Sequence, residues 1–172
     1  MTFCSARVLA LALIGLAGCA GPPLPESNVT PNIIEGSFPE AESAVRAAML
    51  STDEHVRTKD FDGLTTDHLD SPKFSKFGPR VLERQGFADM IADEIRAVSA
   101  AQELSVEFRD LKIDVFGDVA IATSYPLFTF KDSDGQPGTR EVRMTLVWVS
   151  TPDGWKIVHE HSSPNTECDC DL

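Results

Sequence analysis

The second half of the chain changes its apolar period, and this change limits the folds available to it. From Glu103 onward apolar side chains recur at every second residue, the spacing of a half-buried strand. Turn residues divide the region into four predicted strands, over about 104–115, 119–130, 139–149 and 155–162. We expect a bulge near Asp110 and a break or bend at Pro126, because proline cannot donate a ladder hydrogen bond. Successive strands without helices between them indicate an antiparallel sheet.

The residues before Glu103 have a helical period instead. They predict a first helix from about Ser37 to Thr58, a short second helix or turn ending near Leu69, and a third helix over about 86–100. Ser37 and Glu40 fit a capping box at the start of the first helix. A short strand is expected over 73–77. The order favours an α+β fold, with about three N-terminal helices packed on one face of a curved antiparallel sheet.

The first 18 residues predict a lipoprotein signal peptide. Arg7 precedes an apolar run of about ten residues, which is too short to span a bilayer. The following Leu16-Ala17-Gly18-Cys19 resembles a bacterial lipobox, in which the cysteine is lipidated and becomes the new N-terminus. We therefore expect lipidation of Cys19 and a location on the periplasmic side of a membrane. Ala20 is not the aspartate of an inner-membrane retention signal, so the outer membrane is favoured.

The remaining chain divides into a tether, one domain and a tail. Residues 19–36 hold four prolines and few large apolar side chains, and predict a flexible tether. Residues 37–164 suit one domain, and residues 165–172 form an acidic tail. Cys168 and Cys170 in this tail could form a strained disulfide or half of a soft metal site, but a frayed tail is preferred.

The net charge and the last predicted strand, over 155–162, limit the classes of partner and ligand that the chain can bind. A formal net charge of −12 without a basic stripe argues against a nucleic-acid partner.

After the Asp153-Gly154 turn, strict alternation places Trp155, Ile157, His159 and His161 on one face and Lys156, Val158, Glu160 and Ser162 on the other. Two histidines lack a third metal ligand, so no metal and no cofactor is expected. Hydrogen-bonded structural histidines are preferred over metal ligands or an acid–base pair.

Several short motifs resemble one superfamily. Gly117-Asp118-Val119-Ala120 and the stretch from Asp153 to Ser162 look like the SnoaL-like branch of the nuclear transport factor 2-like superfamily. Thr145-x-Val147-Trp148 and Trp155-x-x-Val158-His159-x-His161 also resemble the association domain of calcium/calmodulin-dependent kinase II. The resemblance covers about residues 38–164. It implies a cone-shaped fold with a pocket between sheet and helices, often dimeric through the sheet.

The resemblance also implies which residues face the pocket. Positions that carry arginines in the kinase domain hold Pro126, Leu146 and Ser162 here, so a carboxylate-binding pocket of that kind is not expected. The match directs Val158, Glu160 and Ser162 into the pocket, His159 and His161 away from it, and Trp155 into the packed sheet. Val142, Met144, Leu146 and Trp148 share one apolar face, and if this face lines the cone, Trp148, Leu146, Glu160 and Ser162 are the predicted ligand-binding residues.

Three functions fit these patterns. The first is a lipid-anchored binding or assembly module, a homodimer that holds a small apolar ligand or a partner segment. The second is an isomerase or hydro-lyase in which Glu160, with a pKa raised by burial, or His159 and His161 carry the proton, helped by Asp67 and His68. Alternatively, the apolar row is simply part of the core, and Glu160 forms an ion pair with Arg143 or Lys156 at the rim instead of carrying a proton. The third function is a structural lipoprotein with a filled cone.

Overall fold

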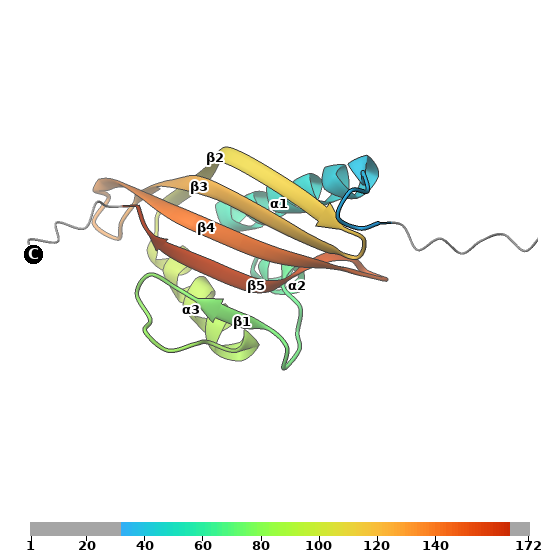
Figure 1. Cartoon of the computed structure of the whole chain (residues 1–172). Coiled ribbons are helices and arrows are strands. Elements are labelled where there is room, and N and C mark those ends of the chain that lie inside the picture. Colours follow the sequence, from blue (N-terminus) through green and yellow to red (C-terminus); the bar gives the residue numbers. More distant parts are fainter. Residues whose placement is uncertain (1–31, 166–172) are drawn as a thin grey trace, which may run out of the picture. The chain divides into compact units, whose positions relative to one another are not determined.

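A computed structural model describes residues 32–165 of the 172-residue chain. The predicted signal peptide, the lipidation site Cys19, most of the tether and nearly all of the acidic tail lie outside these residues. Within them the chain forms three helices and five strands (Figure 1): α1 Pro39–Thr58, α2 Phe61–Asp67, β1 Ser75–Phe77, α3 Phe87–Ala100, β2 Glu103–Phe116, β3 Val119–Lys131, β4 Pro137–Thr151 and β5 Gly154–Pro164.

The five strands form one sheet in the order β1-β5-β4-β3-β2. The three long hairpins β2–β3, β3–β4 and β4–β5 are antiparallel, and only the short β1 runs parallel to its neighbour β5. The helices lie behind the sheet in Figure 1, so one sheet face is covered and the other is open. The predicted α+β fold, with three N-terminal helices on a curved sheet, is confirmed. None of the described helices is both long and apolar enough to cross a membrane.

The start of α1 differs from the prediction. Phe38 is the N-cap residue and its side chain makes no capping hydrogen bond, while Pro39 occupies the first turn. The predicted capping box is therefore wrong, because Ser37 lies one residue before the N-cap position that the box requires. At the other end Lys59 adopts a left-handed conformation (φ 58°). Asp60 then caps α2, since its carboxylate accepts from the Gly63 N–H at 2.9 Å.

Irregularities in the strands decide which side chains face the helices. The predicted bulge in β2 is present: Asp110 has φ 47°, and the β2–β3 register shifts between Arg109 and Lys112. The prediction of a break or bend at Pro126 holds only for the pairing: β3 is one strand through this buried residue, but its ladder with β4 is interrupted at Tyr125 and Pro126 and resumes in the same register. Proline is tolerated there because β3–β4 pairing runs to Ser124 and resumes at Leu127.

A second bulge, in β5, was not predicted. Trp148 pairs with Ile157 whereas Val147 pairs with His159, which leaves Val158 as the extra residue. An extra residue inverts the faces on either side of it. Ile157 is consequently buried in the core, and the prediction that it shares a face with His159 and His161 is wrong.

The core lies between the helices and the covered sheet face. Val45 and Met49 of α1 and Met90 of α3 pack against a row of buried sheet residues: Ile113, Ala120, Ala122, Leu146, Trp148 and Ile157. The small Ala120 is the β3 partner of Trp148 in the sheet register, so the bulkiest core side chain has a small cross-strand neighbour. Trp148 is fully buried as a result.

Candidate functional site

A cluster of charged side chains lies on the helix side of the sheet, where β5 meets β1 and α3. Glu160 comes from β5, Lys76 from β1, Glu94 from α3, and His68 from the residue that follows α2. Lys76 Nζ lies 2.8 Å from Glu160 Oε1 and also contacts the carboxylate of Glu94. His68 Nε2 lies 3.9 Å from Glu160 Oε2, a distance that supports an ionic contact rather than a hydrogen bond. We call these four residues the ionic cluster.

Backbone pairing fixes the geometry of the ionic cluster. Lys76 and Glu160 are direct partners in the parallel β1–β5 ladder, so their side chains leave the sheet on the same side. Lys76 also exchanges both backbone hydrogen bonds with Gln85, whose side chain donates to Asp93 on α3. The loop between β1 and α3 is thereby closed at its base, which holds Lys76 against α3.

The ionic cluster keeps Glu160 ionised. Burial alone would raise the pKa of Glu160, but the charge of Lys76 and the contact with His68 outweigh it and lower the pKa to about 2. Burial likewise opposes the charge on Lys76, yet Glu160 and Glu94 raise its pKa. The expectation of a raised pKa at Glu160 is therefore wrong, because burial was considered without the cation that faces the carboxylate.

His68 is held in one orientation. Its Nδ1 lies 2.9 Å from the carbonyl oxygen of Leu64, which can only accept, so Nδ1 carries a proton. Nε2 then faces the Glu160 carboxylate. When Nε2 is also protonated, the imidazole becomes positively charged and forms an ion pair with Glu160. Burial lowers the pKa of His68, but Glu160 and the Leu64 hydrogen bond outweigh burial and raise it. With His68 protonated, the ionic cluster has two positive and two negative charges.

The structure separates the other predicted site residues from this cluster. His159 and His161 lie on the opposite sheet face, where the rings contact Phe77 edge-on and His159 Nδ1 lies 2.9 Å from the Ser75 hydroxyl. The predicted rim partners of Glu160 are elsewhere: Arg143 donates to the Pro164 carbonyl oxygen and Lys156 to that of Thr66. Asp67 pairs with His55 of α1 at 2.9 Å.

The predicted ligand-binding residues lie on the helix side of the sheet. Leu146 and Trp148 are core residues, Ser162 is buried, and Glu160 belongs to the ionic cluster. The Trp148 indole N–H is buried and has no acceptor among the described residues. Their role in ligand binding stays a prediction. Within residues 32–165, no three His, Cys, Asp or Glu side chains converge as metal ligands.

Lys76 and Glu94 complete the ionic cluster but were not predicted as site residues. The sequence held a signal for each residue. Glu94 falls on the apolar stripe of α3, and Lys76 lies two residues after Phe74 in a short strand and so shares its face. A charged residue on a buried stripe indicates a buried partner. Sequence spacing alone could not join them, because the contact depends on the parallel pairing of β1 with β5.

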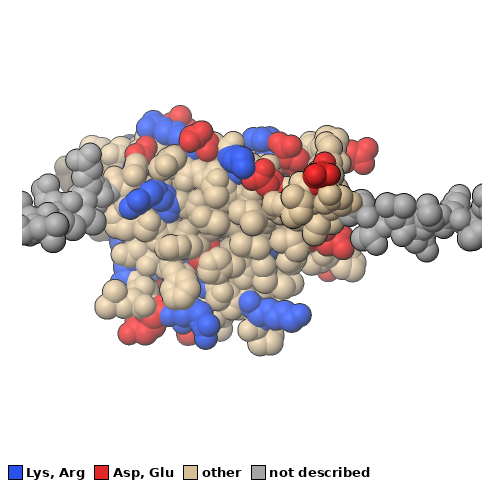
Figure 2. Space-filling view, viewed as in Figure 1, with Lys and Arg blue, Asp and Glu red and all other residues tan. Residues whose placement is uncertain are grey.

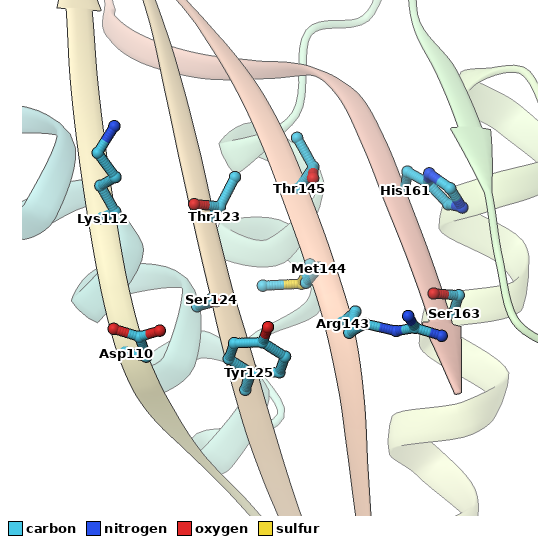
Figure 3. Close-up of a pocket in the computed structure, with 10 residues that line it drawn as sticks. All are labelled: Asp110, Lys112, Thr123, Ser124, Tyr125, Arg143, Met144, Thr145, His161 and Ser163. Atoms are coloured by element: carbon cyan, nitrogen blue, oxygen red, sulfur yellow. The ribbon is translucent and has the colours of Figure 1, made fainter. Parts of the chain in front are cut away.

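The open sheet face has a shallow hollow of about 370 Å³ (Figure 3). Two rows of side chains cross the strands here. Thr123, Thr145 and His161 form one row, and Tyr125, Arg143 and Ser163 form the next. A second hollow, of about 260 Å³, lies beside the segment before α1 and the end of β2. The first hollow lies outside the layer between the sheet and the helices, whereas the second lies between the start of α1, at Glu42, and β2, at Ile113 and Val115.

Comparisons with known proteins identify the fold and a family. A family profile described as the SnoaL-like domain matches residues 45–167. A nuclear transport factor 2-like protein from Salmonella enterica has a TM-score of 0.70 at 20% identity, covering 78% of this chain and 98% of that one. A protein of the same superfamily from Streptomyces avermitilis, named as a candidate dehydratase, has a TM-score of 0.68 at 21% identity over 75% and 99% of the two chains.

A third similar structure is a candidate calcium/calmodulin-dependent kinase II association domain from Xanthomonas campestris. It has a TM-score of 0.64 at 17% identity, covering 77% of this chain and 94% of that one. No curated protein matches the chain. The predicted SnoaL-like family is confirmed by the profile match. At these identities the solved structures support a nuclear transport factor 2-like fold and nothing more.

Proposed function

We propose that this chain, which belongs to the SnoaL-like domain family, is a membrane-tethered assembly module that pairs with a second copy of itself through its open sheet face. The contrast between the two sides of the sheet carries the proposal. On the helix side, the titratable groups of the ionic cluster already satisfy one another. On the open face, apolar and aromatic side chains remain exposed to solvent.

The chemistry of the open face suits a protein partner. Ile121 and Val119 of β3 are 36% and 38% exposed, and Tyr125 and Phe77 are 40% and 42% exposed. Figure 2 shows this face with a largely uncharged centre, while most lysines, arginines and acids lie toward its margins. An apolar centre with a charged rim is the usual anatomy of a protein interface. A twofold pairing of sheets would bring the same patch together from both copies.

The oligomeric state of the lipid-free chain tests this proposal. In Cys19→Ala protein, sedimentation equilibrium should give a dimer, and adding Ile121→Glu should weaken it at least about tenfold, because two buried carboxylates would face the interface. Leu50→Glu is the matched control: Leu50 is 61% exposed on α1 and receives the same change. A monomer before substitution, or equal weakening by both variants, would refute pairing through this face.

Membrane tethering rests on the sequence. The lipobox-like Leu16-Ala17-Gly18-Cys19 supports lipidation of Cys19, and the proline-containing segment after it supports a tether on the periplasmic side, with the outer membrane favoured. A tethered domain is confined near one surface, and confinement raises the effective concentration of its copies. Weak pairing would therefore suffice at the membrane.

A small apolar ligand on the helix side is compatible with this proposal. The ligand would lie beside Trp148 and Leu146. One acceptor atom of the ligand would receive a hydrogen bond from the unpaired indole N–H of Trp148. Native mass spectrometry of the domain purified from its own host tests this directly. A retained molecule that Trp148→Phe loses would support the ligand, whereas a mass equal to that of the bare chain would not.

A proton-transfer enzyme is the second candidate. The pairing of His68 with Glu160 supports it, because an imidazolium beside a carboxylate can supply an acid and a base. One similar structure is named as a candidate dehydratase. Incubation in D₂O with small carbonyl compounds should then exchange their α-hydrogens, and Glu160→Gln should abolish the exchange. Absence of exchange across such a panel would leave the assembly module as the better account.

A further inference from the structure

We propose that Ser51, His55 and Asp67 form a second site, which hydrolyses small uncharged esters with a good leaving group where α1 meets α2. Ser51 and His55 lie one turn apart on α1, and Asp67 is the last residue of α2. We call these three residues the serine site. The helices lie on the side of the sheet away from its open face (Figure 1), so the inference does not depend on pairing through that face.

A tight turn between α1 and α2 brings the three residues together. Lys59 ends α1 in a left-handed conformation, and the Asp60 N–H donates to the His55 carbonyl oxygen at 2.9 Å. α2 therefore starts beside the last turn of α1 and returns Asp67 to His55, which is twelve residues earlier in the chain. Asp67 Oδ2 lies 2.9 Å from His55 Nδ1, and His55 Nε2 lies 3.4 Å from Ser51 Oγ.

These contacts determine which ring nitrogen of His55 carries the proton. An ionised carboxylate can only accept, so His55 Nδ1 donates to Asp67. In the neutral ring, Nε2 then holds a lone pair and accepts from the Ser51 hydroxyl. Its 3.4 Å exceeds the length of a strong hydrogen bond, but nucleophile–base contacts often shorten when substrate binds. This chain of donors and acceptors is the one that activates the nucleophile of serine hydrolases.

Gly63 of α2 holds the His55 ring in this orientation. A Cβ atom at Gly63 would lie 2.6 Å from His55 Cδ2 and 2.7 Å from its Cγ and Nε2. The ring therefore lies directly against the glycine backbone, an approach that a larger residue would block. Glycine makes a helix less stable than alanine does, and the position of the ring gives a reason for glycine here. His55 is thus confined by Asp67, Gly63 and Ser51 together.

The surroundings of the serine site limit its substrate. Ser51 is exposed, whereas the side chains of His55 and Asp67 are 22% and 13% exposed, so the nucleophile is open and its base is partly shielded. Neither of the two hollows is lined by these residues, so few contacts hold the substrate and its leaving group must depart easily. Asp60 and Asp62 at the start of α2 disfavour an anion. An uncharged aryl ester meets these conditions.

The serine site supplies each proton transfer of ester hydrolysis. Ser51 Oγ attacks the ester carbonyl carbon while its proton passes to His55 Nε2. Nε2 gives this proton to the leaving oxygen, the carbon–oxygen bond breaks, and the alcohol departs with the acyl group left on Ser51. Nε2 then takes a proton from water, whose oxygen attacks the acyl carbon, and Ser51 Oγ regains the proton as the carboxylic acid leaves. One ester and one water give one acid and one alcohol.

Diisopropyl fluorophosphate tests the nucleophile in the full-length protein. Ser51 Oγ displaces fluoride from phosphorus, and peptide mass spectrometry quantifies the adduct at each serine. Ser51 should react at least about tenfold faster than Ser99, because a positioned base accelerates such steps by about 10²–10⁴. Ser99 is the internal reference, since it is exposed on α3 and has no histidine within four residues in the sequence. Equal rates would overturn the inference, and this comparison needs no variant.

Substitution of the base and its partner separates catalysis from folding. His55→Gln should lower the labelling of Ser51 to the rate of Ser99, and labelling that is unchanged would also overturn the inference. Asp67 is a positioning residue: Asp67→Asn should slow labelling at least about tenfold, and Asp67→Glu should restore part of the rate because a carboxylate sets the tautomer. A purely structural role predicts the reverse order, since asparagine has the shape of aspartate and glutamate does not. Circular dichroism verifies that each variant is folded.

Turnover of 4-nitrophenyl acetate tests hydrolysis itself. Ser51→Ala should reduce the release of 4-nitrophenolate to the background rate, and its fold should persist because Ser51 is exposed. Ser99→Ala is the matched control and should keep the wild-type rate. An equal rate in Ser51→Ala and wild type would overturn the inference. Release that stops at one equivalent per chain would overturn it as well, because the acyl group would then stay on Ser51.

Discussion

Lys76 and Glu160 are direct partners in the parallel β1–β5 ladder, and their charged atoms meet at 2.8 Å on the helix side of the sheet. The side chain of Lys76 is 9% exposed and that of Glu160 is 13% exposed. Two opposite charges removed from water in this way stabilise a structure only as a pair. The pair therefore fixes the position of the short strand β1, which has only three residues of its own.

Lys76→Met should destabilise the domain by about 3–5 kcal/mol at pH 7, because it leaves the Glu160 carboxylate buried without its main cation. Urea denaturation measures the loss. Lys76→Met/Glu160→Gln should recover more than half of it, since the unpaired charge is then absent. Lys112→Met is the control: its pair with Asp114 is exposed, and the change should cost less than about 1 kcal/mol. A similar loss for both single variants would contradict a special role for the buried pair.

The pKa of His68 is raised in the folded protein, so its contribution to stability is greatest at low pH. This contribution should be present in full below the ordinary histidine value of about 6.5 and be lost as pH rises through the higher folded value. The free energy of unfolding of wild type relative to His68→Gln, measured from pH 5 to 9, should therefore decrease with pH. A difference that stays constant would show that His68 does not change protonation with folding.

The pKa of Glu160 is lowered to about 2, so its contribution has the opposite pH dependence. The stability that it provides should be present above the ordinary glutamate value of about 4.3 and be lost as pH falls toward 2. Wild type and Glu160→Gln should consequently converge in stability during acid titration. If wild type keeps its full advantage at pH 2.5, the carboxylate is not ion-paired in the folded chain.

The sequence predicted the layers of the fold better than the faces of its last strand. Regular period-two and helical spacing located every element, and the irregular spacing at Asp110 located the bulge of β2. The β5 bulge carries no such signal, because Val158 is apolar like its neighbour Ile157 and suits either face. Lys76 and Glu94 of the ionic cluster were missed for a different reason: they come from β1 and α3, and the parallel β1–β5 pairing that brings Lys76 to Glu160 cannot be read from local patterns.

Trp148 and Trp155 should differ in their contribution to stability. Trp148 is fully buried, and Trp148→Ala should cost about 3–5 kcal/mol. Trp155 packs against the core but is only partly buried, so Trp155→Ala should cost less, about 1–3 kcal/mol. Trp148→Phe should be the mildest change, since the indole N–H that it removes has no described acceptor. Urea denaturation measures both losses. Equal denaturation midpoints for the two alanine variants would contradict the difference in burial between Trp148 and Trp155.

Cys19→Ala should release the protein from membranes without changing the stability of the domain. The sequence predicts lipid on Cys19, which lies well before α1, so its substitution is expected to remove no packing contact of the folded domain. Fractionation after a salt and carbonate wash measures the release, and a urea titration of the released protein measures stability. Cys4→Ala is the matched control, because Cys4 lies in the predicted leader and its loss should leave the protein in the membrane fraction. Retention of the Cys19→Ala protein after the wash would show that something other than a lipid on this cysteine holds the chain at the membrane.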